Sequence, residues 1–387
     1  MKLFVFVTLS SLLCFAQEDG PRQRAGKYEV QLRLPADGLY AQEEMQIEYR
    51  VTDTSRVDPV MGAAPVIRAA TKSSIDMPAM QGMPTLEELA HPEGIPGEYG
   101  VHPLFAHGGE YRLRLTIKPL ADAEFVVTFL LNVADASAAK NRKPKPKPYT
   151  MDLKTSPKSP KAGEPVELIF TFHQRESAKD TFKDFIVQHE KLMHLLIVRE
   201  DLGVVSHEHP QMGEDGQFRT TFTFPTAGEF HLFGDVAPKG AGSQVMMVKL
   251  KVSGKGAPKY DISKTERKPV FIADGLKVEF AGALKAIGTR KTQSLMFEVS
   301  DQASGAPATN LQPYLGAMGH LILIHEDGVT LVHSHPDERL PDVGKDGKVP
   351  FLARFPKPGN YRGWAQFQRD GKVVTSAFVM SATAGAE

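Results

Sequence analysis

Two stretches of the chain share the pattern His-x12-His-x-His-Pro, with no insertion between the two copies. Imidazole nitrogens are among the commonest ligands of zinc and copper, and three of them can hold an ion while one coordination position stays open. The two copies therefore predict two metal sites of one kind. The expected ligands are His194, His207 and His209 in the first copy, and His320, His333 and His335 in the second.

The turn in the second copy predicts how its histidines are arranged. Asp327-Gly328 is a strong signal for a two-residue β-hairpin loop, because both positions tolerate positive φ. With this loop Glu326 pairs with Val329, and the same register places His320 opposite His335. The middle histidine is two residues from the last one, so all three share one face at the open end of the hairpin. The first copy has the same spacing and is expected to have the same geometry.

Additional ligands and a structural alternative both stay open at these hairpins. His189 and Met193 lie just before or beside the first triplet, and each could add a ligand there. His325 falls on the opposite face of its strand from His320 and is not expected to bind an ion. A single histidine in a strand is more often a hydrogen-bonded structural residue than a ligand, so both copies could instead serve packing.

A cluster of softer donor atoms lies nearer the N-terminus. The run Met77-Pro78-Ala79-Met80-Gln81-Gly82-Met83-Pro84 is rich in thioethers, which suit Cu(I). Its prolines and glycine argue against a regular core strand, so a loop is predicted, with Met77, Met80 and Met83 as ligands. Aligned on the end of the returning strand, Met77-Pro78 takes the place of His209-Pro210. Methionine also fills irregular gaps in cores, which is the alternative.

Composition and repeats divide the chain into three similar segments. Linkers are predicted at 136–148, which ends in alternating lysine and proline, and at 253–268, which contains Gly254, Gly256 and Pro258. Each segment carries the motif Phe-x-x-x-Gly-x-aromatic and alternating runs that are typical of strands. We predict an all-β protein with three tandem immunoglobulin-like antiparallel β-sandwich domains, at 26–135, 149–252 and 269–383.

The N-terminus and the composition indicate an exported protein. Lys2 and the apolar run after it predict a signal peptide at residues 1–16, and cleavage there would remove Cys14, the only cysteine among 387 residues. The mature chain would then lack disulfides, Fe–S clusters, thiol nucleophiles and a blue-copper site. Lys and Arg total 46 and Asp and Glu total 46, which argues against nucleic-acid binding. No later stretch is long and apolar enough to span a membrane, so a periplasmic or secreted location is predicted.

Three of the motifs resemble those of a group of bacterial exported domains. The run His189-Glu190-Lys191-Leu192-Met193-His194, followed by His207-Glu208-His209-Pro210, is similar to YtkA-like and FixH-like domains. The run 313–320, followed by His333-Ser334-His335-Pro336, shows the same similarity, and the Met-Pro-rich loop resembles a loop of that group. The resemblance implies an immunoglobulin-like sandwich, an extracytoplasmic location and a link to copper or other heavy metals.

The function predicted from these residues is non-catalytic metal binding by an exported protein, with copper or zinc as the ion. Its expected partners are the metal ion and, as a further option, another periplasmic or membrane protein. One alternative is a structural or interaction array of immunoglobulin-like domains with packing histidines. Another is a metallo-hydrolase that activates water at the open coordination position. The sequence shows no serine nucleophile elbow, phosphate-binding glycine loop or HExxH motif, which weighs against an enzyme.

Overall fold

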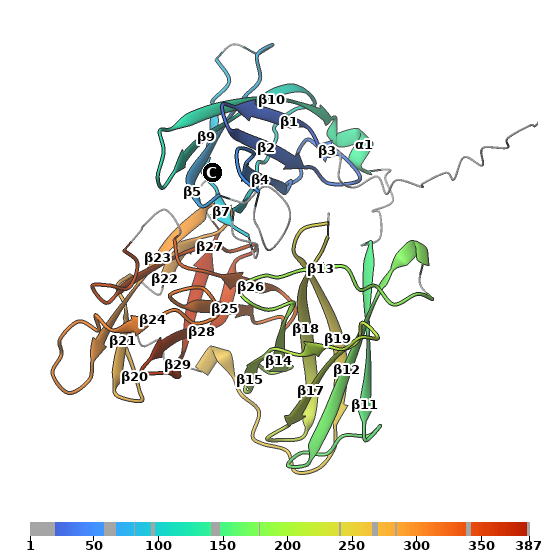
Figure 1. Ribbon diagram of the computed structural model, residues 1–387, viewed down its shortest axis with the longest axis vertical. Coiled ribbons are helices and arrows are strands. Elements are labelled where there is room, and N and C mark those ends of the chain that lie inside the picture. The colour runs from blue at the N-terminus through green and yellow to red at the C-terminus, as the bar shows by residue number, and fades with distance from the viewer. Residues whose placement is uncertain are drawn as a thin grey trace, which may run out of the picture.

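Runs of alternating apolar and polar residues become strands with one buried face, and these strands dominate the structure (Figure 1). The computed structural model describes residues 20–57, 67–80, 82–93, 97–140, 148–177, 179–239, 241–264, 270–282, 285–337 and 342–384. Six sheets are present in this part of the chain, two from each predicted domain. The prediction of an all-β fold built from antiparallel sandwiches is confirmed. The predicted signal peptide, residues 1–16, lies outside the described residues.

The first domain pairs two five-stranded sheets around one core. The first sheet has the order β1 (Arg22–Ala25), β2 (Tyr28–Arg33), β4 (Ile47–Asp53), β8 (Glu98–Val101), β7 (His91–Pro92). The second has the order β3 (Leu39–Tyr40), β10 (Phe125–Ala134), β9 (Gly109–Pro119), β5 (Ala69–Asp76), β6 (Leu86–Leu89). All pairs are antiparallel except the short β3–β10 pair.

The second domain has the same two-layer plan. Its first sheet has the order β11 (Tyr149–Ser156), β12 (Pro165–Gln174), β17 (Phe218–Thr223), β16 (Gln211–Met212). Its second sheet has the order β13 (Phe185–Ile186), β18 (Gly228–Pro238), β14 (Met193–Arg199), β15 (Val205–Glu208), with β19 (Gln244–Val252) also paired to β18. The predicted histidine hairpin is therefore β14–β15, at the edge of this sheet.

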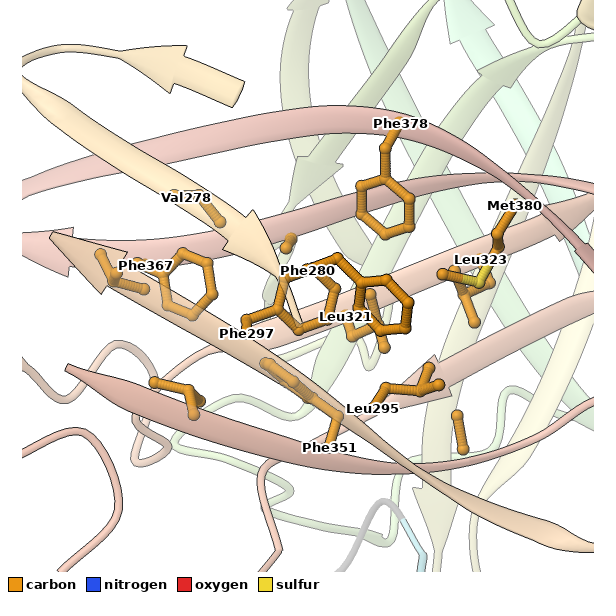
Figure 2. Close-up of a cluster of buried hydrophobic side chains, with 14 of the residues drawn as sticks. Val278, Phe280, Leu295, Phe297, Leu321, Leu323, Phe351, Phe367, Phe378 and Met380 are labelled. Carbon is orange, nitrogen blue, oxygen red and sulfur yellow. The ribbon is translucent and has the colours of Figure 1, made fainter. Parts of the chain in front are cut away.

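The third domain repeats the plan around a phenylalanine-rich core (Figure 2). Its first sheet has the order β20 (Val270–Ala273), β21 (Leu276–Phe280), β23 (Thr292–Asp301), β27 (Lys348–Arg354). Its second has the order β22 (Lys285–Gly288), β29 (Lys372–Thr383), β28 (Gly359–Arg369), β25 (His320–His325), β26 (Leu331–Ser334), with β24 (Leu311–Gln312) also paired to β28. The second predicted histidine hairpin is β25–β26.

The motif Phe-x-x-x-Gly-x-aromatic has one structural role in all three domains. Its glycine begins the central strand, β9, β18 or β28, with φ between 133° and 149°, where a side chain would be strained. The strand then carries the aromatic residue into the core against the motif's phenylalanine, with ring centroids 4.7–5.0 Å apart. In the third domain the Tyr361 hydroxyl also donates to the Lys357 carbonyl at 2.8 Å, which fixes the corner before the strand.

The described part of each predicted linker contains a short helix. Residues Ala136–Lys140 form a short helix, α1, and 141–147 lie outside the described residues. The second linker includes a short 3-10 helix, Ile262–Lys264, and lies against the domains on either side of it. There Tyr260 stacks on the Arg362 guanidinium at 3.8 Å and its backbone N–H donates to Asp201. Among the described residues, no helix is long and apolar enough to cross a bilayer.

A fourth apolar cluster joins the second and third domains. Its buried members come from the outer faces of β14, β18, β25 and β28 and from one hairpin turn; they are Leu196, Val198, Leu202, Phe233, Ile322, Ile324 and Trp364. The two histidine hairpins therefore pack against each other across the domain boundary. The first domain contacts the third, where β7 lies beside β27 (Figure 1) and Arg354 pairs with Glu44 at 2.6 Å.

Candidate metal centre

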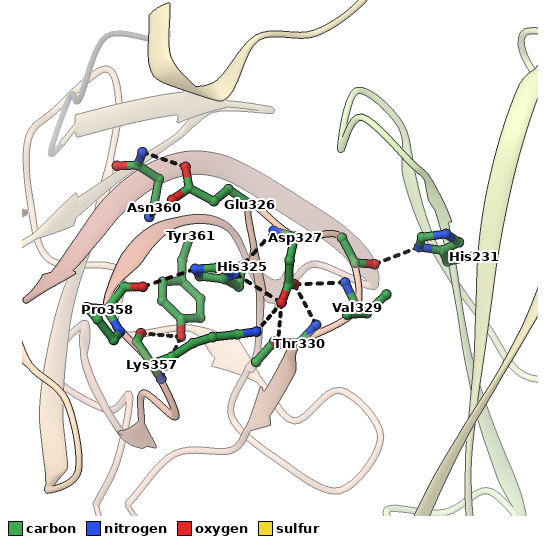
Figure 3. A network of polar contacts seen from close by, with 11 residues as sticks. His231, His325, Glu326, Asp327, Val329, Thr330, Lys357, Pro358, Asn360 and Tyr361 are labelled. Carbon is green, nitrogen blue, oxygen red and sulfur yellow. Dashed lines mark hydrogen bonds and ion pairs between the residues drawn. The ribbon is translucent and has the colours of Figure 1, made fainter.

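The hairpin register follows the sequence prediction, but the loop does not. Ile322 pairs with His333, and the register continues so that His320 faces His335. The loop has four residues instead of two, because the closing contact is the His325 N–H to the Thr330 carbonyl at 3.0 Å. The Asp327 carboxylate accepts hydrogen bonds from the backbone N–H groups of Val329 and Thr330, which holds the wider turn (Figure 3). One residue is added on each side of the turn, so the pairing of the histidines is unchanged.

Each hairpin presents its histidines to the other domain. In β25, Leu321 and Leu323 enter the core of their own domain, whereas Ile322 and Ile324 join the cluster between domains. Because side chains alternate along a strand, His320 shares the outward face with these isoleucines. β14 repeats the arrangement with His194. The two predicted sites, which the sequence places in separate domains, therefore meet at one interface.

We call His194, His207 and His209 triplet A, and His320, His333 and His335 triplet B. In each triplet the structure brings one ring nitrogen of every histidine within 4.8 Å of the others. These are the only such groups of three or more His, Cys, Asp or Glu side chains among the described residues. All six triplet histidines that the sequence predicted as ligands are therefore brought together.

Triplet B has three ring nitrogens without a hydrogen-bond partner. His320 donates from Nε2 to the Tyr314 carbonyl at 2.9 Å, which leaves the lone pair on its Nδ1. His333 faces the Asp235 carboxylate through Nδ1 at 3.4 Å, which leaves Nε2 free. The buried nitrogens without a partner are His320 Nδ1, His333 Nε2 and His335 Nε2. Oxygens that only accept hydrogen bonds thus hold two of the rings in a metal-binding tautomer.

Triplet A differs in that two of its ring nitrogens contact each other. His194 donates from Nε2 to the Gln188 carbonyl at 3.0 Å, and its Nδ1 lies 3.2 Å from His207 Nε2. The other nitrogen of His207 contacts the Gln366 amide oxygen at 3.0 Å. With Nε2 of His194 occupied as a donor, its Nδ1 carries a lone pair that points toward a second imidazole. His209 Nε2 is buried without a partner.

Each of the two domains supplies a residue that contacts a histidine ring of the other domain. Gln366 of the third domain contacts His207, and Asp235 of the second domain contacts His333. These two residues occupy matching positions, since Asp235 pairs with His194 in β18 and Gln366 pairs with His320 in β28. The hairpin turns are exchanged too: His231 donates to the Gly328 carbonyl at 2.6 Å (Figure 3), and Arg362 donates to the Leu202 carbonyl.

Burial favours the neutral form of several rings at this interface. Desolvation, reinforced by repulsion from neighbouring imidazoles, lowers the pKa of His194 to about 4 and the pKa of His189 and His209 to about 3. The same causes lower the pKa of His207, His320 and His335 well below the usual range. Neutral imidazole is the form that ligates metals, so the five triplet rings among these need not release a proton to bind at pH 7. Asp235 is ionised there: burial opposes its charge, but contact with His333 outweighs this and lowers its pKa.

Comparison with known proteins identifies a family for the two histidine-bearing domains. A family model described as a domain of unknown function, DUF8832, matches residues 146–254 and again 270–384. The chain belongs to this family. The two matches cover the two domains that carry triplets A and B. No curated protein matches the sequence, and the resemblance to YtkA-like and FixH-like domains stays a prediction.

Solved structures that resemble the chain are remote in sequence. One is a tetra-tandem repeat from the extending region of a large adhesion protein, at 14% identity and a TM-score of 0.20, covering 92% of this chain and 74% of that one. The Escherichia coli adhesin FdeC gives 13% identity and a TM-score of 0.21, covering 94% and 99%. E. coli alpha-2-macroglobulin gives 11% identity and a TM-score of 0.24, covering 96% and 23%.

The two extra ligands predicted beside triplet A lie outside it. Met193 points to the opposite face from His194 and is fully buried in the core of the second domain, so the structure does not bring it to triplet A. His189 comes closer, because its ring stacks on His335 of the other triplet with centroids 3.7 Å apart. Its φ of 41° turns the chain back over the cluster, and both of its ring nitrogens are buried without a partner.

Replacing His189 by leucine is expected to raise the free energy of unfolding of the metal-free protein by about 1–3 kcal/mol, because the change removes two buried polar atoms that lack partners. The third domain already has Leu315 at the matching position, with a similar φ of 51°. Urea denaturation of the H189L variant and the wild type at pH 7.5 with chelator measures the difference. The reverse change, Leu315→His, should destabilise. A lower free energy of unfolding in H189L would contradict the prediction, because it would mean that the His189 ring makes stabilising contacts.

The methionine loop does not occupy the place predicted for it. It joins β5 to β6, and the pairing of Asp76 with Arg112 near the start of β9 puts Met77 at the end of its domain that corresponds to a hairpin turn. The histidines lie at the opposite end of their hairpins. Met77 and Met83 pack partly against the core, and Met80 is exposed. Copper binding by these three thioethers stays a prediction.

Proposed function

We propose that this protein binds transition-metal ions, copper or zinc, through triplets A and B, as a non-catalytic exported binding protein. The observation that carries the proposal is the set of three partnerless nitrogens in triplet B, held by acceptor oxygens behind two of the rings. Polar atoms buried without partners destabilise a fold, and a cation placed among the three lone pairs would satisfy all of them. The export part of the proposal rests on the N-terminal sequence.

The donor set favours copper and zinc over other common ions. Imidazole suits zinc and copper, whereas calcium and magnesium are held mainly by oxygen ligands. Metal binding without hydrolysis is favoured because most of the histidine rings are buried at the interface between the second and third domains. A cavity between the second and third domains is lined by Tyr149, Phe233, Met246 and Leu331 and by no histidine. An enzyme of the hydrolase kind would need substrate space beside the rings.

The direct test is the metal content of the full chain. Protein purified without chelator, or titrated with Zn(II) or Cu(II) in a calorimeter, should bind two ions per chain. The H194A/H209A and H320A/H335A double variants should each lose one ion. The exposed His107→Ala change serves as the matched control and should lose none. Equal binding by the control and by a variant with all four changes would refute the proposal.

A structural role is the second candidate, and a specific observation favours it. The hairpin faces that carry the histidines also form the apolar cluster between the domains. In this view the rings hold the second domain against the third and take up no ion. The metal measurement separates the two functions, since a packing role predicts no bound metal in any of these proteins.

The exchanged contacts predict different strengths for the two sites. Replacing Asp235 by asparagine should weaken the site at triplet B by about 10–100-fold, because a carboxylate behind a ligating imidazole raises its basicity and fixes its tautomer. Gln366→Leu should lower the metal affinity of triplet A and leave that of triplet B unchanged. Competition against a chromogenic chelator measures each affinity. Equal weakening of both sites by D235N would contradict the assignment of Asp235 to triplet B.

A further inference from the structure

The shortest ring separations between the two triplets are similar to the longest separations within them, although other rings of one triplet lie as close as 4.7 Å. Ring centroids of His194 and His207 lie 5.4 Å apart within triplet A, and those of His320 and His333 lie 5.8 Å apart within triplet B. Across the two triplets, His207 lies 5.6 Å from His333 and 5.8 Å from His320, and His194 lies 5.9 Å from His333. Geometrically the six imidazoles form one cluster.

This spacing determines how two bound ions would relate. A ligating nitrogen lies about 2.0–2.1 Å from zinc, and ions in two-metal protein sites lie about 3.5–4 Å apart. Ring centroids of His207 and His333 that lie 5.6 Å apart are compatible with two ions close enough to share a ligand. Because His207 and His333 are oriented by residues of the opposite domain, both sites form together when the two domains dock.

The charge of the cluster points to the ligand that would complete it. Imidazole ligands bring no negative charge to two divalent ions, and the Asp235 carboxylate lies against one triplet ring, that of His333. Buried charge without compensation is strongly unfavourable. Each ion would also have an open coordination position, since a triplet supplies three nitrogens. A small anion shared between the ions meets both needs.

We infer that triplets A and B form a single dinuclear centre, in which two divalent ions share one small anionic bridge such as hydroxide. This inference rests on the proposed metal-binding function. The bridge forms when a water molecule bound between the ions loses one proton to solvent, which two cations favour because they lower the pKa of bound water. No electron is transferred in this step.

Electron paramagnetic resonance of the full chain loaded with two equivalents of Cu(II) at pH 7.5 tests the inference. A single-atom bridge couples the two unpaired spins, so the integrated signal should fall to a small fraction of the two-spin intensity. Acid denaturation of the same sample should restore both spins, which shows that the copper was not reduced. Copper bound at two per chain with the full two-spin signal would overturn the dinuclear centre and leave the proposed function intact.

A variant with one triplet removed provides the matched control. H333A/H335A should bind one Cu(II) and give the complete one-spin signal, because no second ion is present to couple with. If that variant is silent as well, coupling between the triplets is not the cause and the inference fails. If the wild type binds no copper or zinc at all, the proposed function itself fails. Far-ultraviolet circular dichroism checks that the variant keeps its strands.

Discussion

Zinc present at a hundred times its dissociation constant is expected to raise the free energy of unfolding by about 2.7 kcal/mol for each occupied triplet. The reason is linkage: an ion that binds the folded rings and not the unfolded chain shifts the equilibrium toward the folded state. Chemical denaturation with Zn(II) or with chelator, followed by tryptophan fluorescence, measures the shift. Trp364 is well placed as the reporter, because it lies in the cluster between the two histidine-bearing domains.

A variant with His194, His209, His320 and His335 all replaced by alanine should lose this zinc-dependent gain completely. The double variants of one triplet should keep about half of it. His107→Ala should keep the whole zinc-dependent gain, because this exposed histidine belongs to neither triplet. An equal zinc effect in the four-site variant and the wild type would contradict the assignment of the triplets as the binding sites.

The metal-free protein should lose stability steeply on acidification from pH 6.5 to about pH 4. The pKa of His194 is about 4 in the folded state and near 6.5 in the unfolded chain, so between these values only the unfolded chain binds the proton. Proton uptake by the unfolded state lowers the free energy of unfolding as pH falls, and the full contribution is present above pH 6.5. His194 alone corresponds to on the order of 3 kcal/mol across this window.

Urea midpoints measured at pH 7.5, 5.5 and 4.5 in the presence of chelator would test the acid effect. His189→Leu should make the dependence shallower, because the pKa of that ring is lowered to about 3 and leucine does not titrate. Saturating zinc should make the urea midpoint depend less on pH near pH 6.5, since bound ions compete with protons for the same nitrogens. A midpoint that does not change between pH 7.5 and 4.5 would contradict the burial of neutral rings.

The local geometry of the candidate site could be predicted from the sequence, because it depends on short-range rules. Spacing and a turn signal were enough to place His320 opposite His335, even though the loop is two residues longer than predicted. The error did not matter, since lengthening a hairpin loop evenly on both strands preserves the register. The sandwich fold could also be predicted, because the alternation of many strands and the repeated glycine are visible in the sequence.

The meeting of the two triplets could not be derived in the same way, because it depends on packing between domains. One signal was present: residues 195–198 are all apolar, without the alternation of a strand that has one wet face. Both faces of β14 are in fact buried, one in its own domain and one against the third domain. The roles of Asp235 and Gln366 required knowing which strand of each domain lies beside the hairpin, and which domain lies opposite.

The crossed contacts at His207 and His333 have a mechanical consequence. Each ring is held by an oxygen from the neighbouring domain, so a pull that hinges the two domains apart would misalign a ligand in both triplets at the same moment. Conversely, ions seated there would resist that hinge and stiffen the joint. The bending rigidity of this part of the chain would then be set by the concentration of free metal around it.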